Sequence, residues 1–472
     1  MTGPLVLFRR RFETDTVTRE TRYAKTADGV YIAYQVAGSG PVDFAADFHA
    51  FAGNVDLIWD EPDWGQFVVG FSQFARLVIH DRRGSGASTR NVPPPNLETR
   101  AADLLAVLDE VGSDAPVLGA AASTGAMHAL FAATYPSRTS GLVWNYPRAR
   151  LAWAPDYPWG KGPEAFAAEL AQAASWGTTG YARELALSRA AQRAGTPDDQ
   201  KDTLAVDDEL MRRYARVTRN TVSPDVAEAL TRIQWQTDVR DILPSVHTPT
   251  ALIIGEADPR AQLEEAEYVA SLMPNATVHK LPGRSGLQVE AVMDIARDLA
   301  GVQRRQEAST VLATVLFTDL VDSTRTQAEL GDRRWRELLL SHHEVIRAAL
   351  SEWGGTEHDT AGDGFFASFA GPARAIDCAH EIAGRVSELG IEVRAGVHIG
   401  ECEVIDGKPG GLAVTIGARL LGAAGPQEVL VSQTVKDLVA GSGFSFTDRG
   451  VHELKGVPDR WRLYLAEPAQ AA

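Results

Sequence analysis

The chain has little cysteine and no long apolar run. Only two of its 472 residues are cysteines, Cys378 and Cys402, which excludes a disulfide framework, and no cysteine or histidine spacing suggests a zinc site. No run of 18 or more apolar residues occurs, so no membrane-spanning helix is expected. Residues 1–15 place a short apolar run before arginines, the wrong order for a secretory signal. These absences predict a cytoplasmic protein.

The chain also has fewer basic than acidic residues. Lysine and arginine number 46 against 62 aspartates and glutamates, so the formal net charge is −16. An acidic surface of this size argues against general binding to nucleic acids or anionic membranes. The composition is otherwise that of a globular protein, with 44% apolar and 23% charged residues. A chain of 472 residues is too long for one ordinary domain, so at least two hydrophobic cores are expected.

The first part of the chain, residues 22–300, alternates short apolar runs with helical patterns. Buried strands are predicted at residues 42–49, 76–81, 115–120, 140–145 and 249–255. Apolar residues recur at helical spacing between them, as at residues 97–112 and 264–273. This alternation of strand and helix predicts a mainly parallel sheet covered by helices, an α/β fold.

A polar stretch at residues 301–310 separates this part from a second domain at residues 311–468, and residues 1–21 are expected to be an N-terminal extension. The second domain opens with an almost wholly apolar strand. A helix, a hairpin at residues 358–369, another helix and another strand follow. This βαββαβ order predicts a compact α+β domain with an antiparallel-rich sheet and helices on one face, the ferredoxin-like plan.

Two carboxylates of the second domain stand at strand ends. Asp319 closes the apolar first strand, and Asp363 lies in the turn of the predicted hairpin. A carboxylate at the end of a buried strand must be satisfied by the backbone donors of the next turn or by a cation. If the hairpin lies beside the first strand, the two carboxylates converge and can bind divalent ions. The alternative is an ordinary turn, because Asp and Gly are favoured there.

Five separated motifs of this domain carry charged or small residues at set positions: FTDLVDST, TAGDGFFASF, RAGVHIGE, AVTIGARL and ELKGV. In their order and spacing, over residues 310–467, they resemble the catalytic domain of class III nucleotidyl cyclases of the bacterial type. The resemblance implies that Asp319, Asp363 and the backbone of Leu320 hold two Mg²⁺ or Mn²⁺ ions. Such ions make the ribose 3′-hydroxyl more acidic and neutralise charge on the triphosphate.

The same resemblance assigns the remaining motif residues. Arg394 matches a phosphate-binding arginine, and Lys455 matches the lysine that holds the terminal phosphates. Arg419 matches the arginine that steadies charge in the transition state, and Thr415 stands four residues earlier, where the family has Asn or His. A hydroxyl has a shorter reach, so a slower enzyme is expected. Because the family builds its site between two cyclase domains, one domain per chain implies a head-to-tail homodimer.

The base-recognition positions depart most from the family. Adenylate cyclases place Lys four residues before the second metal-binding Asp, and Asp seven residues before the transition-state Asn. Here these positions hold Asp359 and Lys408, so the charges are exchanged. A carboxylate accepts hydrogen bonds where an ammonium donates them, and guanine offers more donors on that edge than adenine. Asp359 therefore favours GTP, whereas the resemblance to bacterial adenylate cyclases favours ATP.

The first domain resembles an α/β-hydrolase over residues 22–299, through HDRRGSGAS, LGAAASTGAMHALFAATYP and LIIGEADP. Such enzymes carry Ser at a strained strand-to-helix turn and finish with Asp and His. Here the nucleophile position is Ala122, Asp258 matches the acid, and the His position is Gly286. Without Ser and His, neither attack nor proton transfer has a carrier. Ser123 lies one position away, so an esterase remains an alternative.

The leading interpretation is an adenylate cyclase, a phosphorus–oxygen lyase that forms cyclic AMP and pyrophosphate. The retained hydrolase fold is expected to offer a pocket near Phe48, Trp144 and Trp153, where a small apolar ligand shifts the cyclase dimer. Three alternatives stay open beside the esterase. The protein is a guanylate cyclase, or it is a degenerate cyclase that binds nucleotide without turnover, or its first domain aids only dimerisation or solubility.

Overall fold

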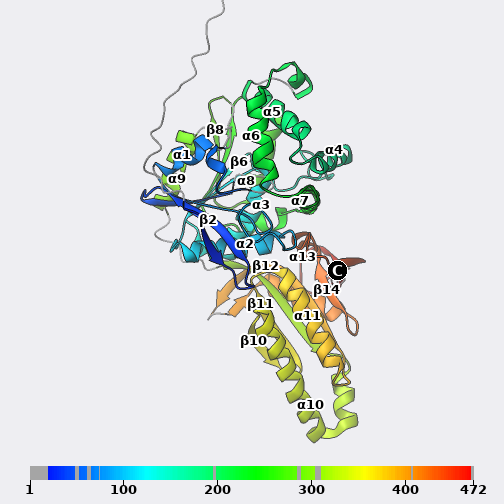
Figure 1. Cartoon of the computed structure of the whole chain (residues 1–472). Helices are drawn as coiled ribbons and strands as arrows, with labels where there is room; N and C mark the ends of the chain where they lie inside the picture. Colours follow the sequence, from blue (N-terminus) through cyan, green and yellow to red (C-terminus); the bar gives the residue numbers. More distant parts are fainter. Residues whose placement is uncertain are drawn as a thin grey trace, which may run out of the picture.

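The computed structural model describes most of the chain, namely residues 20–47, 53–60, 65–73, 75–194, 198–283, 289–302, 310–405 and 408–468. These residues form two eight-stranded sheets, the first sheet within residues 22–281 and the second sheet within residues 310–467 (Figure 1). Within the described ranges, no helix has both the length and the apolar character needed to cross a membrane.

The first sheet is mainly parallel, as predicted. Its strands are β1 (Arg22–Lys25), β2 (Tyr31–Ala37), β3 (Val42–Asp47), β4 (Ala75–His80), β5 (Val117–Ala121), β6 (Gly141–Asn145), β7 (Thr250–Gly255) and β8 (Ala276–Leu281). They lie in the order β1-β2-β4-β3-β5-β6-β7-β8, and every neighbouring pair from β4 onward is parallel. β1 and β2 add antiparallel pairs at one edge. Every residue of β7 is buried, which explains its continuous apolar sequence.

The helices of the first half surround this sheet. They are α1 (Gly65–Ser72), α2 (Leu97–Glu110), α3 (Gly125–Thr134), α4 (Pro163–Ala174), α5 (Thr179–Ala194), α6 (Asp208–Arg219), α7 (Pro224–Gln236), α8 (Arg260–Leu272) and α9 (Val289–Val302), with the 3-10 turns η1 (Ile58–Asp60), η2 (Ala122–Thr124), η3 (Pro136–Arg138), η4 (Asp198–Thr203) and η5 (Arg240–Ser245). α4 to α7 are inserted between β6 and β7, where α4 packs on α7 and α5 packs on α6 (Figure 1). This insertion is absent from the sequence-based prediction.

α2 illustrates how the local sequence sets a helix. The Asn96 side chain accepts a hydrogen bond from the Thr99 amide at 2.8 Å and caps the first turn. Leu104 and Leu108 are fully buried one turn apart, so one face of the helix joins the core. Gly112, just beyond the end of the helix, has a φ of +62° that favours glycine. The local sequence therefore fixes both ends of α2. The helix lies between the first sheet and the second half of the chain.

The second sheet is mixed and mostly antiparallel, as predicted. Its strands are β9 (Thr310–Leu320), β10 (Thr356–Ala361), β11 (Gly364–Phe369), β12 (Val393–Ile405), β13 (Lys408–Gly410), β14 (Val429–Ser432), β15 (Ser445–Glu453) and β16 (Arg460–Glu467). The order is β10-β11-β9-β12-β14-β16-β15, with β13 on β12, and only the β12–β14 pair is parallel. Its helices are α10 (Ser323–Trp353), α11 (Pro372–Ser387), α12 (Leu412–Ala423) and α13 (Gln433–Leu438).

β9 is covered on both faces, which explains its nearly continuous apolar sequence and shows that the expectation of helices on one face only is wrong. Leu312 and Leu316 join the core that includes α11, whereas Ala313 and Val315 pack with Ala413 of α12. This alternation is the two-residue period of a strand. Because odd-numbered residues of β9 face α12, the position of Asp319 places it on the α12 side of the sheet.

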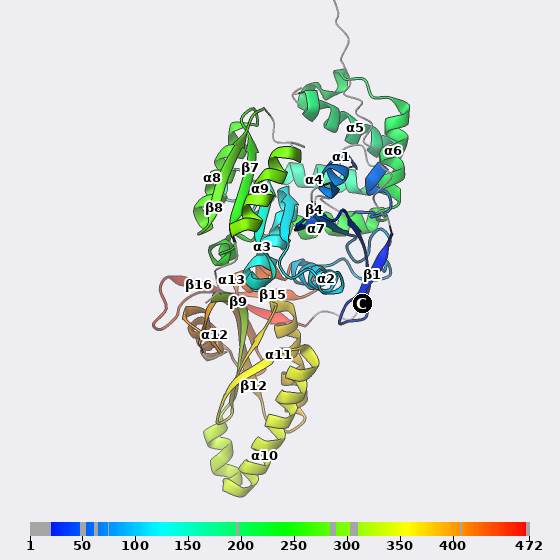
Figure 2. The ribbon, with the colours of Figure 1, turned by 90° about the vertical axis from the view of Figure 1, so that its left-hand side faces the viewer.

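The two halves of the chain pack directly against each other. α3 and η5 contact β9, and η5 also contacts β12 (Figures 1 and 2). Buried apolar residues of both halves form one continuous cluster, which includes Leu104 of the first half and Ile376 of the second half. In both views α10 extends away from the first half. Hydrogen bonds across the contact join the Ala373 amide to Glu98 at 2.8 Å, Thr434 to Asp241 at 3.1 Å and His247 to Glu401 at 2.7 Å.

Candidate active site

One end of the second sheet brings Asp319 and Arg394 together. The two residues are direct neighbours in the antiparallel register of β9 and β12. The Arg394 Nη2 donates a hydrogen bond to Asp319 Oδ2 at 2.7 Å, and the two side chains are 33% and 28% exposed. An ion pair this open to solvent contributes little to stability, about 1 kcal/mol or less. The pair is therefore available for a ligand to rearrange.

Asp363 reaches the same end of the sheet through the β10–β11 turn. Gly362, with a φ of +66°, makes the turn, and β11 pairs with β9 so that Phe365 lies opposite Thr318. This register puts the turn next to Asp319. Asp363 Oδ2 is buried and has no hydrogen-bond partner among the described residues, and the same is true of Arg394 Nε. Leaving such atoms unpaired costs about 1–3 kcal/mol each, so a bound ligand that engages them is favoured.

The donor set at this edge fits a hard divalent cation. Asp319 and Asp363 supply carboxylate oxygens, and Leu320, the buried last residue of β9, supplies a backbone carbonyl. Among the described residues, no cluster of three or more His, Cys, Asp or Glu side chains is placed to hold a metal. A cation at this edge would have two side-chain ligands, and its remaining ligands would come from the backbone, water or substrate.

α10 supports the turn that carries Asp363. The His343 Nε2 donates a hydrogen bond to the Gly362 carbonyl at 3.0 Å. One turn further along, Arg347 pairs with Glu357 of β10 at 2.9 Å and lies over the ring of Phe365. The sequence analysis missed these contacts, because nothing in the local pattern of α10 distinguishes His343 from a surface histidine.

A second group of candidate residues lies on α12 and in the turn before β16. The Arg419 Nε donates a hydrogen bond to the Lys455 carbonyl at 2.8 Å, and both side chains are exposed. Thr415 lies one turn before Arg419 and donates to the Gly411 carbonyl at 3.3 Å. α12 lies very close to the sheet, since a Cβ at Gly417 would be 2.7 Å from Val315. Among the described residues, no hydrogen bond or ion pair joins this group to Asp319 or Asp363.

The two base-recognition positions lie on neighbouring parts of the second sheet. Asp359 is exposed on β10, and its Oδ1 accepts from the Thr360 amide at 2.9 Å. Lys408 is the exposed first residue of β13. Burial and then the charge of Lys408 lower the pKa of His358, the residue before Asp359. Within the described part of one chain, Asp359 and Lys408 do not form an ion pair with each other.

The first sheet carries a strained strand-to-helix turn at the predicted elbow. Ala122 follows β5 with a φ of +50°, in the left-handed region that residues other than glycine rarely adopt. The Trp144 Nε1 donates to the Ala122 carbonyl at 2.6 Å, and Thr124 Oγ1 donates to the Asp47 carbonyl at 2.7 Å. Ser123 is the next residue in the turn. This is the geometry of a nucleophile elbow with a methyl group at its centre.

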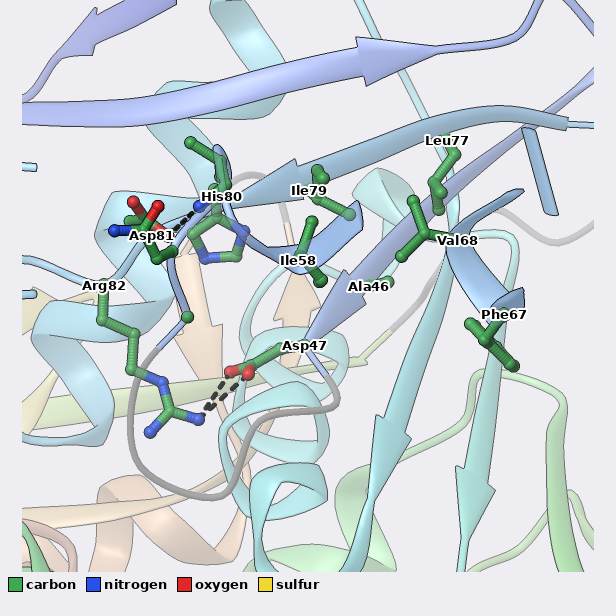
Figure 3. A pocket seen from close by; sticks show the side chains of 13 residues that line it. Ala46, Asp47, Ile58, Phe67, Val68, Leu77, Ile79, His80, Asp81 and Arg82 are labelled. Atoms are coloured by element: carbon green, nitrogen blue, oxygen red, sulfur yellow. Dashed lines mark hydrogen bonds and ion pairs between the residues drawn. The ribbon is translucent and has the colours of Figure 1, made fainter. Parts of the chain in front are cut away.

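The structure describes only some of the other site positions that were predicted in the first half. Asp258 Oδ2 accepts from the Gly255 amide at 2.6 Å, at the end of β7. Gly286 and Phe48 lie outside the described residues. Trp144 is fully buried and Trp153 is 53% exposed, and neither lines the cavity beside Asp47 and Ile79 (Figure 3) or the cavity beside Ser123. The pocket predicted around these tryptophans is therefore not where these cavities lie.

A buried charged cluster, which the sequence analysis missed, stands beside the elbow. Arg82 donates two hydrogen bonds to Asp47, both at 3.0 Å (Figure 3). Arg100 donates one more at 2.8 Å. Burial alone raises the pKa of Asp47, but the charges of the two arginines hold it well below its usual range. His128 is fully buried, and burial lowers its pKa to about 4. His128 is thus a neutral core residue.

Comparisons with known proteins identify both halves. Residues 48–285 match the family model described as alpha/beta hydrolase fold, which spans half of the chain, so the chain belongs to the α/β-hydrolase fold family. Residues 305–467 match the model described as adenylate and guanylate cyclase catalytic domain. The second half is therefore a class III nucleotidyl cyclase domain, of a family of phosphorus–oxygen lyases that generally uses divalent metals.

Individual relatives cover one half or the other. "Putative adenylate cyclase 3" of Rhizobium meliloti is 26% identical over 171 residues, which are 34% of this chain and 29% of that protein. The crystal structure of the adenylyl cyclase CyaB from P. aeruginosa aligns with 34% of this chain and 96% of its own, at 20% identity and a TM-score of 0.32. A bromoperoxidase from Bacillus anthracis aligns with 59% and 98%, at 19% identity and a TM-score of 0.45. The chain thus spans less than a third of the curated relative.

Proposed function

We propose that the protein is an adenylate cyclase that converts ATP to 3′,5′-cyclic AMP and pyrophosphate. The observation that carries this proposal is the edge of the second sheet, where Asp363 Oδ2 and Arg394 Nε are buried without partners beside Asp319. A carboxylate pair next to an incompletely satisfied guanidinium suits a metal-bound triphosphate. The similarity to a putative adenylate cyclase supports ATP as the substrate.

In this proposal Asp319, Asp363 and the Leu320 carbonyl hold two Mg²⁺ or Mn²⁺ ions. When bound, such ions lower the pKa of the ribose 3′-hydroxyl and neutralise charge on the triphosphate. Arg394 binds a phosphate oxygen, and to do so its guanidinium turns from Asp319 toward the nucleotide. Breaking the Arg394–Asp319 ion pair costs little free energy, because both side chains are partly exposed.

Arg419, Thr415 and Lys455 complete the site from a second copy of the chain. Arg419 and Lys455 are already joined by a hydrogen bond, so they can approach the triphosphate as one unit. Lys455 holds the terminal phosphates and Arg419 stabilises charge on the transferring phosphoryl group. Because this group makes no hydrogen bond or ion pair with Asp319 or Asp363 within the described part of one chain, a twofold homodimer supplies two complete sites in this proposal.

Guanylate cyclase is the second candidate function, and Asp359 favours it. The carboxylate is exposed on β10, where it can accept hydrogen bonds from a base, and guanine offers more donors than adenine. Lys408 lies nearby as a donor to a base carbonyl. The variant Asp359→Lys tests this assignment. If Asp359 reads the base, the ratio of ATP to GTP turnover changes, and an unchanged ratio removes Asp359 from base recognition.

The first half, in this proposal, is a hydrolase fold without hydrolase chemistry that regulates the cyclase domain. The supporting observation is Ala122, whose left-handed backbone occupies the place of the nucleophile while its side chain carries no hydroxyl. Gly286, at the histidine position, likewise carries no base. An esterase that uses Ser123 is less favoured, because a one-residue shift at such a turn aims the side chain elsewhere.

The deciding experiment supplies purified full-length protein with ATP or GTP and Mn²⁺, and identifies the cyclic product by mass spectrometry. Cyclic AMP that is lost in Asp319→Ala supports adenylate cyclase, and cyclic GMP that is lost in the same variant supports the second candidate. Nucleotide binding without any product supports a degenerate sensor instead. An ester assay in parallel, with Ser123→Ala as its control, tests the esterase.

A further inference from the structure

The β10–β11 hairpin carries Asp363 in a turn of only two residues. Ala361 and Gly364 pair across this turn, so Gly362 and Asp363 form the whole loop. Gly362 has a φ of +66°, and Asp363 is not among the described non-glycine residues with a positive φ. Glycine at the first central position is typical of a type II′ turn. The peptide group between Gly362 and Asp363 is the central peptide of this turn.

The central peptide of such a turn can lie in either of two orientations. Types I′ and II′ both have a positive φ at the first central residue, but only type I′ also has one at the second. Rotation of the Gly362–Asp363 peptide would therefore carry Asp363 into the left-handed region, which aspartate tolerates better than most residues. Its carboxylate would then point in a different direction. The sequence of the hairpin alone thus leaves the direction of this carboxylate open.

α10 supplies a contact that holds the central peptide in one orientation. The helix runs beside β10 (Figure 1), and the His343 Nε2 donates a hydrogen bond to the Gly362 carbonyl at 3.0 Å. This carbonyl belongs to the central peptide, whereas the hydrogen bond that closes a two-residue turn uses the flanking residues. If the peptide rotated, its carbonyl would turn away from His343 and the hydrogen bond would be lost. The contact therefore stabilises the orientation in which Asp363 is observed.

Neighbouring contacts orient the imidazole of His343 toward the turn. Its ring meets the ring of Phe365 edge to face, with the ring centres 5.0 Å apart and an angle of 84° between the planes. Arg347 lies one helical turn further along the same face of α10. It donates two hydrogen bonds of 2.9 Å to Glu357 of β10, and its guanidinium lies 5.7 Å from the centre of the Phe365 ring. α10 thus contacts both strands of the hairpin, and the imidazole is held in place between them.

The Asp363 carboxylate indicates what the fixed orientation serves. Its Oδ2 is buried and accepts no hydrogen bond from any described residue, an arrangement that costs free energy unless a ligand engages the oxygen. We propose that His343 is a positioning residue that fixes the Asp363 carboxylate for a divalent cation by holding the Gly362 carbonyl. Groups that orient metal ligands in this way set the affinity of the site. This inference deepens the proposed function and rests on its assignment of Asp363 as a metal ligand.

Titration of the full chain with Mn²⁺ alone, followed by the electron paramagnetic resonance signal of the free ion, tests this role. The binding that is lost in Asp363→Ala defines the site. We expect His343→Leu, which removes the donor, to weaken this binding at least about tenfold. His343→Gln keeps an N–H donor and should bind Mn²⁺ within about twofold of the wild type. Unchanged affinity in His343→Leu, or an equally large loss in His343→Gln, overturns the proposal.

Two further variants keep this test decisive. The His452 Nε2 also donates to a backbone carbonyl, that of Arg449 at 2.9 Å, so His452→Leu removes the same kind of hydrogen bond on β15. This matched control should bind Mn²⁺ as tightly as the wild type, and a loss as large as in His343→Leu contradicts a specific role. His343→Asn carries an amide that is too short to reach the turn. It should weaken binding as His343→Leu does, and it serves if His343→Leu does not fold.

Amide hydrogen exchange tests the positioning itself, and it needs neither metal nor turnover. In His343→Leu, we expect the amides of residues 360–365 to exchange at least about threefold faster than in the wild type. α4 provides an internal control whose exchange stays constant. Unchanged exchange in the hairpin overturns the claim that His343 fixes the turn. Mn²⁺ binding that Asp363→Ala leaves intact refutes the metal assignment of the proposed function instead, so the two failures are distinguishable.

Discussion

The two sheet edges of this chain hold buried charge in opposite ways. At the first sheet, Asp47 is engaged by Arg82 and Arg100, and the neighbouring turn carries a methyl group at Ala122. At the second sheet, no described residue makes a hydrogen bond to the buried Asp363 Oδ2. Both edges look functional from their composition. The difference lies in the carboxylates: Asp47 is satisfied by arginines of the chain, whereas the buried oxygen of Asp363 is left for a ligand to satisfy.

The largest expected effect is that of Asp363→Ala on turnover. We expect cyclic nucleotide formation to fall roughly 1,000-fold or more, equivalent to about 4 kcal/mol of transition-state stabilisation. The unfolding transition should not weaken, because the buried Oδ2 that is removed has no hydrogen-bond partner among the described residues. Steady-state rates and denaturant unfolding measure the two quantities. Asp332→Ala, an exposed position on α10, is the control, and full activity in Asp363→Ala would contradict the assignment.

Asp47→Ala should show the reverse behaviour. It leaves the buried guanidinium groups of Arg82 and Arg100 without their carboxylate, so the free energy of unfolding should fall by roughly 3–5 kcal/mol. Thermal unfolding followed by circular dichroism measures this loss. Asp28→Ala removes an exposed partner of Arg83, which keeps Asp103, and should cost at most about 1 kcal/mol. Equal losses in the two variants would break the comparison between the two sheet edges.

Glu98 should make the contact between the halves depend on pH. Burial raises its pKa to about 6, against the effects of the Ala373 hydrogen bond and Arg374, and Asp377 adds to the rise. Because the folded chain then binds more protons than the unfolded chain, stability from this group is complete below about pH 4.5. It is lost as the pH rises through 6, by about 2 kcal/mol at most.

The variant Glu98→Gln removes this titration. It should match the wild type at pH 4.5 and be more stable at pH 8, as measured by denaturant midpoints at both values. Glu110→Gln, an exposed position at the end of α2, is the matched control and should show no such divergence. A Glu98→Gln variant that is less stable than the wild type at pH 8 would show that the carboxylate is ionised at little cost in the contact.

The smallest expected effect concerns the strain at Ala122. Glycine adopts a φ of +50° without steric cost, so Ala122→Gly should raise the free energy of unfolding by about 1 kcal/mol. Ala168→Gly, at an exposed helical position of α4, should lower it by about 1 kcal/mol. Thermal unfolding of both variants shows whether each change raises or lowers the free energy of unfolding. A lower free energy of unfolding in both variants would mean that the turn at Ala122 is unstrained.

Much of the fold follows from the sequence because its periodicities are strong. β9 is apolar on both faces, and α11 repeats buried residues at Ile376, Ala379 and Ala383, so local patterns locate both elements. The helices inserted between β6 and β7 were not predicted, although α6 buries Tyr214, Ala215 and Thr218 on one face and is charged elsewhere. A helical pattern of this kind shows that a helix forms, but it does not show that the helix belongs to an insertion between two strands.

The candidate active site is foreseeable only in part. The strand-end positions of Asp319 and Asp363 are visible in the sequence, and the hairpin register accounts for their approach. The roles assigned to them, and to Arg394, Arg419 and Lys455, stay predictions. Tertiary contacts such as His343 with Gly362 have no local signal. The same holds for Asp47, whose partners lie 35 and 53 residues away along the chain.

Mixing two inactive variants tests most directly the claim that the site is assembled from two chains. Asp363→Ala disables the metal-binding residues of its own chain, and Arg419→Ala disables the group on α12. Each mixed dimer therefore contains one site in which both groups are intact. After the chains exchange in an equal mixture, we predict cyclic nucleotide formation at about one quarter of the wild-type rate, because half of the dimers carry one of two sites. An equal mixture that remains as inactive as its separate components contradicts the account.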